Sequence, residues 1–437
     1  MHSQEDTCHL ESQTVEETTF PPLSAQPILQ KIGNLFKGDK TIWAIFIVLC
    51  AISLVEMYSA SSTIVYRRGN QFAPILSHSV HLLLGLGVIL VLHNVRSKYF
   101  AVFPIALFGS IILLIITAIG IVGDTINHAN RWINVFGFTI QPSEIAKISL
   151  MGTVAFLLSK QNGKDDGVLF KWMIGLMTVV CVIIAVDNLS TAVLLFGVCF
   201  LLMFIGNVST ARLLKTVGAL VVSATLFILL LGVLPDEWKH QGPLRRAATW
   251  ENRILNFGNR TDTQETAQFT LGDGSTFQIN AARIAIANGG IINFPGRGTA
   301  RDFLPQAYSD FIYAIIIEDM GLIGGLLVLI LYIMILIRAG MIARKTEKLF
   351  PKYLILGSAL MLSVQAFVHM AVNVGILPVT GQPLPLISRG GTSIIVTCAY
   401  FGLILSADRF GIGASKPEIA PETVETASEE VFHEIKV

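Results

Sequence analysis

The stretch LPQAYSDFIYAIIIEDMG, residues 304–321, begins an apolar segment that continues to about residue 337. A segment of this length can cross a bilayer, because a spanning helix needs about 20 mostly apolar residues. It carries one carboxylate, Asp310, at its entrance and two more, Glu318 and Asp319, two turns deeper. Charges in such places are costly unless they are paired, hydrated or used, so each of the three needs a role.

The composition of the whole chain agrees with a membrane protein. Of its 437 residues, 53% are hydrophobic and only 14% are charged, whereas soluble globular proteins carry roughly 25% charged residues. The net charge of +1 gives no indication of nucleic-acid binding. Four of the five cysteines lie in apolar runs and no CxxC is present, so neither a disulfide framework nor a zinc site is expected. The polar first 40 residues do not resemble a cleavable signal peptide.

Apolar runs predict an all-α polytopic membrane protein with about ten transmembrane helices. The expected spans are roughly 41–61, 76–95, 100–122, 142–159, 170–187, 189–206, 213–234, 310–337, 353–374 and 384–406. This ten-helix domain, residues 41–410, is flanked by polar tails, 1–40 and 411–437, which we expect to be disordered and cytoplasmic. A large extracellular loop, 235–309, separates the seventh and eighth spans, and its apolar periodicity over 275–290 predicts an interfacial helix.

Lysine and arginine in the short loops predict the orientation. They concentrate in one alternating set of connections, which the positive-inside rule places in the cytoplasm with both termini. The long loop 235–309 is basic although it lies on the outer side. It is either a solvated surface that faces lipid phosphates or a site for an anionic substrate at the outer leaflet. Composition alone slightly favours the first interpretation.

Several polar residues are expected inside the bundle. Glu144 and Lys147 lie three residues apart, so they share a helix face. They predict an ion pair that faces the interior, with a structural role and a site role equally favoured. The turn Asp187–Asn188 is better explained as turn and N-cap chemistry than as a site. His369 and Asn373 share a face four residues apart, and a structural pair is favoured over a metal site.

The stretch GILPVTGQPLPLISRGGTSII, residues 375–395, combines three prolines with several glycines. It therefore predicts irregular backbone at a membrane boundary, where such backbone is tolerated only inside protein or against water. We expect it to line a cavity. Its Gly390–Gly391–Thr392–Ser393 run could present backbone N–H groups to an anion, although this signal is weak when taken alone.

Three long motifs together resemble one known family. NRWINVFGFTIQPSEIAK (130–147), LPQAYSDFIYAIIIEDMGLIGG (304–325) and LPVTGQPLPLISRGGTS (377–393) are similar to the SEDS family, the shape, elongation, division and sporulation proteins. The similarity covers about 41–410, in order and with the same number of spans. The opening segment and the long tails look more like the cell-division branch than the elongation branch.

The resemblance implies a peptidoglycan glycosyltransferase that polymerises lipid II by inverting transfer at the outer face of the cytoplasmic membrane, at the division septum. The implied partners are a class B penicillin-binding protein transpeptidase and other divisome proteins. Undecaprenyl diphosphate is the implied leaving group. A divalent cation, Mg or Mn, is a possible cofactor, and no organic cofactor is expected. A lipid II flippase, an elongation-type glycosyltransferase and a non-catalytic scaffold stay open as alternatives.

The resemblance also carries residue roles. The family's essential acid lies in a His-Thr-Asp-Phe motif, which here reads Tyr308-Ser309-Asp310-Phe311, so Asp310 is the implied general base. Glu318 and Asp319 match a family acid pair, and we expect their role to be structural or conformational. A second departure from the family is Ser388-Arg389-Gly390-Gly391, where the family has Ser-Tyr-Gly-Gly. The expected substrate-binding set is Glu144, Lys147, Arg253, Arg260, Arg301, Ser309, Ser388, Gly390 and Gly391.

Overall fold

The computed structural model describes residues 36–60, 72–120, 124–126, 129–135, 138–161, 166–233, 274–296, 298, 304 and 307–411. The chain divides into two units, Met1–Phe36 and Lys37–Val437. Every element described below belongs to the second unit. The expected tails and most of the loop 235–309 lie outside the described residues, so the prediction of their disorder is not addressed.

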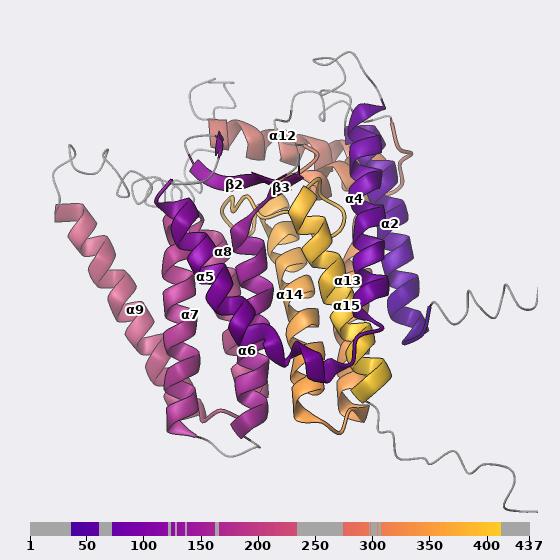
Figure 1. The fold of residues 1–437 in the computed structure, drawn as a ribbon. Coiled ribbons are helices and arrows are strands. Elements are labelled where there is room, and N and C mark those ends of the chain that lie inside the picture. Colours follow the sequence, from indigo (N-terminus) through magenta and orange to yellow (C-terminus); the bar gives the residue numbers. More distant parts are fainter. Residues whose placement is uncertain are drawn as a thin grey trace, which may run out of the picture. The chain divides into compact units, whose positions relative to one another are not determined.

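Ten long helices make up most of the described residues, as the apolar runs predict. They are α2 (Lys40–Ala60), α4 (Ala73–Leu92), α5 (Phe103–Ala118, led in by η1, Ser97–Val102), α6 (Pro142–Gln161), α7 (Gly167–Asp187), α8 (Leu189–Ile205), α9 (Thr210–Val233), α13 (Ile312–Lys345), α14 (Leu349–Asn373) and α15 (Gly391–Gly411). A shorter helix, α12 (Gly274–Gly289), lies across the ends of the long helices (Figure 1).

Length and composition make this a multi-pass membrane protein. Eight helices of the described chain, with η1 and α5 counted together, are long and apolar enough to cross a membrane. Of the other two long helices, α8 is apolar but has only 17 residues. The remaining one, α6, carries Glu144, Lys147 and Lys160. The all-α polytopic fold predicted from the sequence is therefore confirmed.

The tenth span begins later than predicted. Residues 384–390 are not helical, and α15 starts at Gly391 instead of at 384. Pro383 and Pro385 explain the difference, because proline has no N–H to donate and disfavours helix in the residue before it. The eighth span is also longer than predicted and continues to Lys345.

A small sheet between α5 and α6 was not predicted. Its strands β1 (Asp124–Ile126), β2 (Ala129–Val135) and β3 (Phe138–Ile140) are antiparallel in the order β1-β2-β3. Ile133 of β2 pairs with Ile140 of β3. The alternating apolar residues around 133–140 are a strand signal that the search for spans overlooked. The sheet brings the chain to the start of α6 at the end of the bundle where α12 lies (Figure 1).

The helices differ greatly in burial. Of the most apolar window of α14, 72% is buried, whereas only 6% of that of α9 is buried. The long helix α14 packs on α6, α8, α13 and α15, and it is the centre of the bundle. By contrast, α9 meets α8 at one end and leans away from the other helices at its far end (Figure 1).

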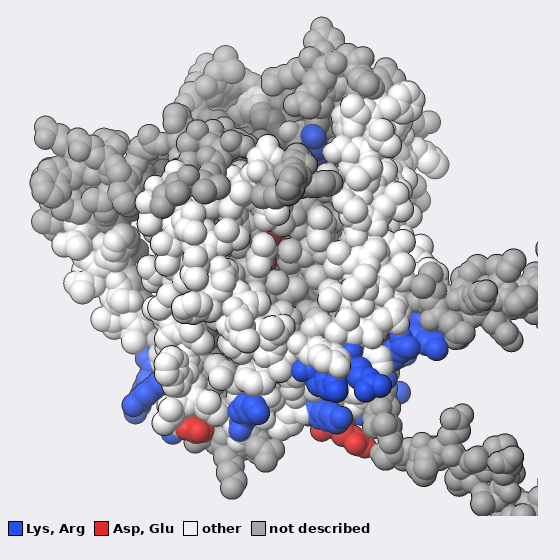
Figure 2. Space-filling model, viewed as in Figure 1, with Lys and Arg blue, Asp and Glu red and all other residues white. Residues whose placement is uncertain are grey.

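Lysine and arginine gather along one end of the helices, opposite α12 (Figure 2). Lys160 at the end of α6 and Arg344 and Lys345 at the end of α13 belong to this group. At the same end, Asp39 caps α2 by accepting hydrogen bonds from the backbone N–H of Thr41 and Ile42 (2.9 and 3.1 Å). The Asp39 carboxylate also pairs with Arg338 of α13 at 2.7 Å.

The long helix α13 is interrupted at Gly321. This residue has φ 75° and ψ −177°, a backbone conformation that is essentially restricted to glycine. The residues around the break pair with the chain after α12, because the N–H groups of Leu322 and Ile323 donate to the carbonyls of Gly290 and Ile291 (3.0 and 3.2 Å). A β-carbon on Gly321 would lie 2.4 Å from the Ile291 carbonyl oxygen. The segment after α12 is thus fixed to the middle of α13.

Candidate functional site

The irregular segment between α14 and α15 (374–390) is held in place by side chains from surrounding helices. Its backbone carbonyls accept hydrogen bonds in the interior. Tyr332 donates to Pro385, and Ser53 donates to Leu386 at 2.9 Å. Leu386 has a positive φ of 68°, a strained conformation that persists only where its surroundings fix it. Ser53 also contacts the ring nitrogen Nε2 of His78 at 2.6 Å.

Two residues of α14 continue this pattern. His369 donates from Nδ1 to the carbonyl of Gln382 at 2.7 Å, and Gln365 donates to the carbonyl of Pro383 at 2.9 Å. The Gln382 side chain in turn donates to the Thr191 hydroxyl of α8 at 2.6 Å. Backbone that leaves regular structure at membrane depth must be satisfied inside the protein, and these bonds achieve that. The irregular backbone predicted for this segment is confirmed, and hydrogen bonds from α14 and to α8 hold it in place.

Asp310 lies against this segment, in a turn two residues before α13 begins at Ile312. Its side chain is partly exposed, and Oδ1 accepts a hydrogen bond from the Ser309 hydroxyl at 2.8 Å. Asn373 fixes the turn by donating to the Asp310 carbonyl at 3.2 Å and accepting from the N–H of Ala314 at 3.1 Å. A β-carbon on Gly381 would lie 3.7 Å from Oδ2 of Asp310. The carboxylate is therefore held in position and still reaches the surface.

His369 and Asn373 form the structural pair that their spacing predicts. The Asn373 amide donates to the His369 carbonyl at 2.9 Å as well as to Asp310. His369 is 1% exposed and bonds to Gln382. Within the described part of the chain, no group of three or more His, Cys, Asp or Glu side chains could hold a metal ion. The pair therefore fixes two backbone segments, the turn of Asp310 through Asn373 and the 374–390 segment through His369.

Arg389 is a cation against Tyr308, two residues before Asp310, that sequence reasoning did not select. Its guanidinium lies 5.3 Å from the centre of the Tyr308 ring, and its backbone N–H donates to the Tyr308 carbonyl at 2.9 Å. Among the described residues no ion pair includes Arg389. Tyr308 and Arg389 both depart from the family motifs, and they are in contact. Their joint departure is the sequence signal that could have identified Arg389.

Ser388 and the glycines after it form the rim of the site. The Ser388 hydroxyl donates to the carbonyl of Ser309 at 2.7 Å and accepts from the N–H of Leu384 at 2.7 Å. Gly391 begins α15, and a β-carbon there would lie 3.0 Å from Nε2 of His81. Ser309 and Ser388 are therefore brought together with Asp310, whereas Gly391 lies against His81.

Glu144 and Lys147 form the interior ion pair that their spacing predicts. The Lys147 Nζ lies 2.8 Å from Oε1 of Glu144, and the two side chains are 1% and 7% exposed. Lys147 also contacts Oε1 of Gln365 at 3.4 Å, which connects the pair to the 374–390 segment. The positive charge of Lys147 is thus already engaged. Arg253, Arg260 and Arg301 lie outside the described residues, so their expected roles stay predictions.

Glu318 and Asp319 are fully buried and belong to the break in α13. Asp319 accepts hydrogen bonds from the Ser59 hydroxyl and, at 3.3 Å, from the N–H of Gly296. The Asn293 amide donates to the Glu318 carbonyl at 2.7 Å. The Asp319 carboxylate and the Glu318 backbone therefore bind the chain after α12 to α13, in line with a structural role for Asp319.

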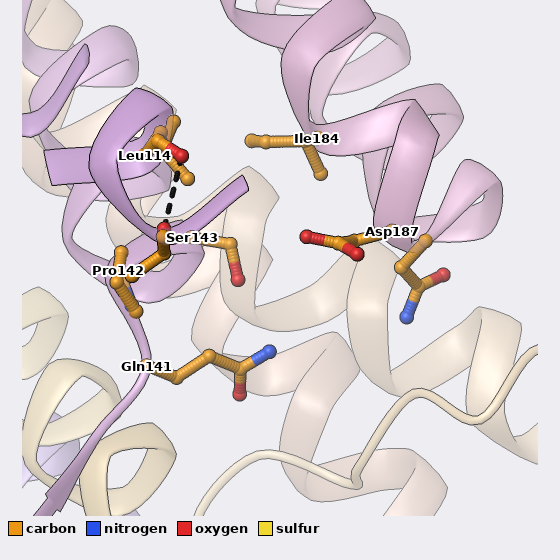
Figure 3. Close-up of a pocket in the computed structure, with 8 residues that line it drawn as sticks. Leu114, Gln141, Pro142, Ser143, Ile184 and Asp187 are labelled. Atoms are coloured by element: carbon orange, nitrogen blue, oxygen red, sulfur yellow. Dashed lines mark hydrogen bonds between the residues drawn. The ribbon is translucent and has the colours of Figure 1, made fainter. Parts of the chain in front are cut away.

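A small recess opens between the ends of α5, α6 and α7 (Figure 3). Asn188 beside it ends α7 and caps α8 by accepting from the N–H of Thr191 at 3.2 Å, so the predicted turn chemistry is confirmed. The recess is lined by Leu114, Thr117, Gln141, Pro142, Ser143, Ile184, Asp187 and Asn188.

Comparison with known proteins agrees with the sequence motifs. A family model described as "Cell cycle protein" (FtsW/RodA/SpoVE) matches residues 39–411. A protein of Geobacter metallireducens named "Probable peptidoglycan glycosyltransferase FtsW" is 29% identical over 86% of this chain and 96% of its own length. A Haemophilus influenzae protein of the same name is 30% identical over 86% and 93%.

Two solved structures have the same fold. One belongs to a study of polymerization and crosslinking by a peptidoglycan synthase complex, and it matches with a TM-score of 0.66 at 24% identity over 86% of this chain and 98% of the other. The other is the rod shape determining protein RodA of Thermus thermophilus, with a TM-score of 0.58 at 22% identity over 87% and 99%. The family model covers the whole described bundle, and the chain therefore belongs to the FtsW/RodA/SpoVE family of cell cycle proteins.

Proposed function

We propose that this protein is a peptidoglycan glycosyltransferase of the FtsW type, which polymerises lipid II at the outer face of the cytoplasmic membrane during septal wall synthesis. Membership of the family and the names of its relatives support this activity. The single observation that carries the mechanism is the position of Asp310. It is partly exposed at the end of the bundle opposite the lysine- and arginine-rich end. By the positive-inside rule that basic end is cytoplasmic. In this proposal Asp310 therefore faces the outer side and both termini are cytoplasmic.

Asp310 acts as the general base in this proposal. The 4-hydroxyl oxygen of one lipid-linked sugar attacks the anomeric carbon of another, and the carboxylate of Asp310 takes the hydroxyl proton. The bond between the anomeric carbon and the phosphate oxygen breaks, and its electron pair leaves with undecaprenyl diphosphate. Ser309 orients the carboxylate by its hydrogen bond of 2.8 Å. Asn373 of α14 holds the turn in place by donating a hydrogen bond to the Asp310 carbonyl.

Arg389 is the described residue best placed to stabilise the departing diphosphate. A guanidinium matches phosphate oxygens with several donors at once. The contact with the Tyr308 ring, two residues before Asp310, positions this side chain, and no acid among the described residues forms an ion pair with it. Lys147 is less suited to this role because Glu144 already balances it. Arg253, Arg260 and Arg301 stay candidates for the same role. A bound divalent cation would neutralise charge on the departing diphosphate. Among the described residues, no group of three or more His, Cys, Asp or Glu side chains could hold it.

The partner proposed for this enzyme is a class B penicillin-binding protein, together with other divisome proteins. One solved structure with this fold comes from a synthase complex that couples polymerization to crosslinking. A polymerase that works beside a transpeptidase would deliver its strands directly to the crosslinking enzyme.

The direct test is polymerisation of labelled lipid II by the purified protein with its class B partner. We expect polymer from the wild type and none from Asp310→Asn, which keeps the size of the side chain. Asp166→Asn is the matched control, because Asp166 caps α7 at the opposite end through the N–H of Val168 and asparagine also caps well. No polymer from the folded wild type in the presence of partner and Mg²⁺ would reject the proposed activity.

A further inference from the structure

Arg283 of α12 is an arginine that the proposed mechanism does not use. Helix α12 lies at the end of the bundle opposite the lysine- and arginine-rich end (Figures 1 and 2). The side chain of Arg283 is exposed, and no acid among the described residues forms an ion pair with it. An exposed guanidinium without a paired carboxylate is available to an anionic ligand, and its planar set of donors suits phosphate oxygens.

The guanidinium lies against the turn that ends α14. A β-carbon on Gly375 would lie 3.3 Å from a terminal nitrogen of Arg283. Gly375 has a φ of 82°, and the N–H groups of Gly375 and Ile376 donate to the carbonyls of Val372 and Ala371 at 3.0 and 2.8 Å. This pattern is the glycine-ended cap that closes many helices. The turn is therefore fixed by its own hydrogen bonds, and Arg283 contacts it where no side chain intervenes.

The same turn presents an apolar surface. Val374, Ile376 and Leu377 are 42%, 68% and 37% exposed. Ile284, which follows Arg283 on α12, is also exposed. A cation that stands beside exposed apolar side chains at the end of a membrane bundle suits an amphiphile. The anionic head of such a ligand would meet the guanidinium, and its hydrocarbon chain would cover the apolar side chains.

The turn is connected to Asp310 on both of its sides. Asn373, two residues before Gly375, donates from its amide to the Asp310 carbonyl at 3.2 Å. After the turn the chain continues to Gly381, where a β-carbon would lie 3.7 Å from Oδ2 of Asp310. Arg283 therefore lies against the same stretch of backbone that borders the proposed base, at a different point from Arg389.

The proposed reaction brings two lipid diphosphates to this end of the protein. Both sugars that react are lipid-linked, so one diphosphate departs while the other stays attached to the product. Arg389 is proposed to stabilise the departing one. Lys147 does not offer a second free charge, because Glu144 pairs with it at 2.8 Å. Arg283 is a further cation at this end that no described acid balances, and it stands beside an apolar surface.

We infer that Arg283 and the turn 374–377 bind the acceptor lipid, whose diphosphate is retained. The guanidinium of Arg283 holds the diphosphate, and Ile376 and Leu377 contact the first units of the prenyl chain. The inference rests on the proposed glycosyltransferase function, since that function supplies a second lipid diphosphate. Because the acceptor diphosphate is unchanged during the transfer, Arg283 binds substrate and transition state equally and affects KM without changing kcat.

The first test measures binding separately from catalysis. Farnesyl diphosphate is titrated into the full-length protein in phosphatidylcholine nanodiscs, with empty nanodiscs as the background. All variants carry Arg389→Gln, which removes the other proposed diphosphate contact. Adding Arg283→Gln should weaken binding about tenfold or more, as expected for loss of a charge-assisted contact. Adding Ile376→Ser should weaken it less. Arg344→Gln is the matched control, because Arg344 is exposed at the opposite end of the bundle.

The source of the phosphate is tested by competition. A soluble short-chain phosphatidylglycerol, added to the same titration, should displace farnesyl diphosphate poorly, because it carries one phosphate and no prenyl chain. Equal affinity of the two ligands would assign the site to ordinary phospholipids and overturn the inference. Equal binding of farnesyl diphosphate with and without Arg283→Gln would overturn it as well.

Turnover provides the second readout. With lipid II and the class B partner, Arg283→Gln alone should raise KM about tenfold and leave kcat and the melting temperature unchanged. Arg344→Gln should change none of these. A lowered kcat at an unchanged KM would contradict the acceptor site. A wild type that binds farnesyl diphosphate through Arg283 but makes no polymer would support the lipid diphosphate site while contradicting the proposed function.

Discussion

Two carboxylates near the start of α13 have opposite surroundings. Asp310, in the turn before α13, is partly exposed and is contacted by Ser309 from the same turn. Asp319, nine residues later, is fully buried and accepts bonds from Ser59 of α2 and from Gly296 after α12. Both are carboxylates in a largely apolar segment. One can meet a substrate, whereas the other is already used to join three parts of the chain.

The difference shows that an intramembrane charge cannot be assigned a role from its position in a motif alone. Burying a carboxylate is costly, so a buried acid that remains must be satisfied by hydrogen bonds or pairs. A carboxylate at an interface remains hydrated and can act on a ligand. Exposure and the origin of its hydrogen-bond partners therefore separate the proposed base from the structural acid. The predictions below test that separation, from the largest expected effect to the smallest.

The largest effect on stability is expected for Asp319→Ala. This change leaves the Ser59 hydroxyl and the Gly296 N–H without their carboxylate acceptor, and each hydrogen bond to a charged group contributes about 1.5–3 kcal/mol. We expect roughly 3 kcal/mol of destabilisation, seen as a lower melting temperature in detergent and a lower yield of folded protein. Polymerisation per folded molecule should fall less than tenfold. A stable Asp319→Ala protein that has lost all activity would contradict the structural role and show that Asp319 takes part in the reaction.

Arg389→Gln should reduce lipid II turnover without affecting folding. Loss of a charge-assisted contact to the departing diphosphate costs about 1.5–3 kcal/mol, which corresponds to a fall of roughly 10- to 100-fold in kcat/KM. Arg389→Lys should retain part of the rate, because it keeps the charge but loses the planar donors and the stacking on Tyr308. Equal rates for wild type and Arg389→Gln at an unchanged melting temperature would remove Arg389 from the mechanism.

Gly321→Ala tests the break in α13. Alanine would have to adopt a backbone conformation that costs of order 1–3 kcal/mol, and its β-carbon would lie 2.4 Å from the Ile291 carbonyl oxygen. We expect a lower melting temperature and faster proteolysis after α12. Gly340→Ala in the same helix is the matched control, because a β-carbon there would have no atom within 4 Å. A melting temperature equal to that of the control would contradict the account of this break.

The smallest effect concerns Asp39. Burial raises the pKa of this carboxyl. The hydrogen bond from Arg338, the capping N–H groups and the charge of Arg338 together lower the pKa by more than burial raises it, so the pKa lies below the ordinary 3.8. A lowered pKa in the folded protein means that the ion pair stabilises the fold fully above pH 3.8 and less as the pH falls through the folded-state pKa. Wild type should therefore exceed Asp39→Asn in melting temperature at pH 6, and the difference should shrink below pH 3.8. A difference that does not change with pH would contradict this assignment.

The sequence predicted the helices well because ten apolar runs and basic loops are strong signals of membrane spans. It also predicted the Glu144–Lys147 pair and the Asn188 cap, since both follow from spacing within or next to a helix. The helical periodicity of 275–290 indicated α12. The residues around Asp310 were selected by resemblance to a family, because a lone acid before a helix is more often a helix-dipole partner.

Contacts between distant segments were not predictable from one sequence. Tyr332, Gln365 and His369 bond to backbone carbonyls that follow them by up to 53 positions, and no local pattern indicates which carbonyl they choose. The same holds for Arg389 and Tyr308, whose contact joins segments that lie on either side of α13 and α14. The sheet β1–β3 was missed because its short strands lie between two spans, where the search was for helical runs.

The measurement that tests the central claim most directly compares Asp310→Asn with Asp319→Asn in initial rates of lipid II coupling per mole of folded protein, with melting temperatures recorded for both. A general base contributes typically 10²- to 10⁴-fold to a rate. The account predicts a fall of that size for Asp310→Asn with an unchanged melting temperature, and a lowered melting temperature with a nearly normal rate for Asp319→Asn. A normal rate for Asp310→Asn together with complete loss for a well-folded Asp319→Asn would contradict it.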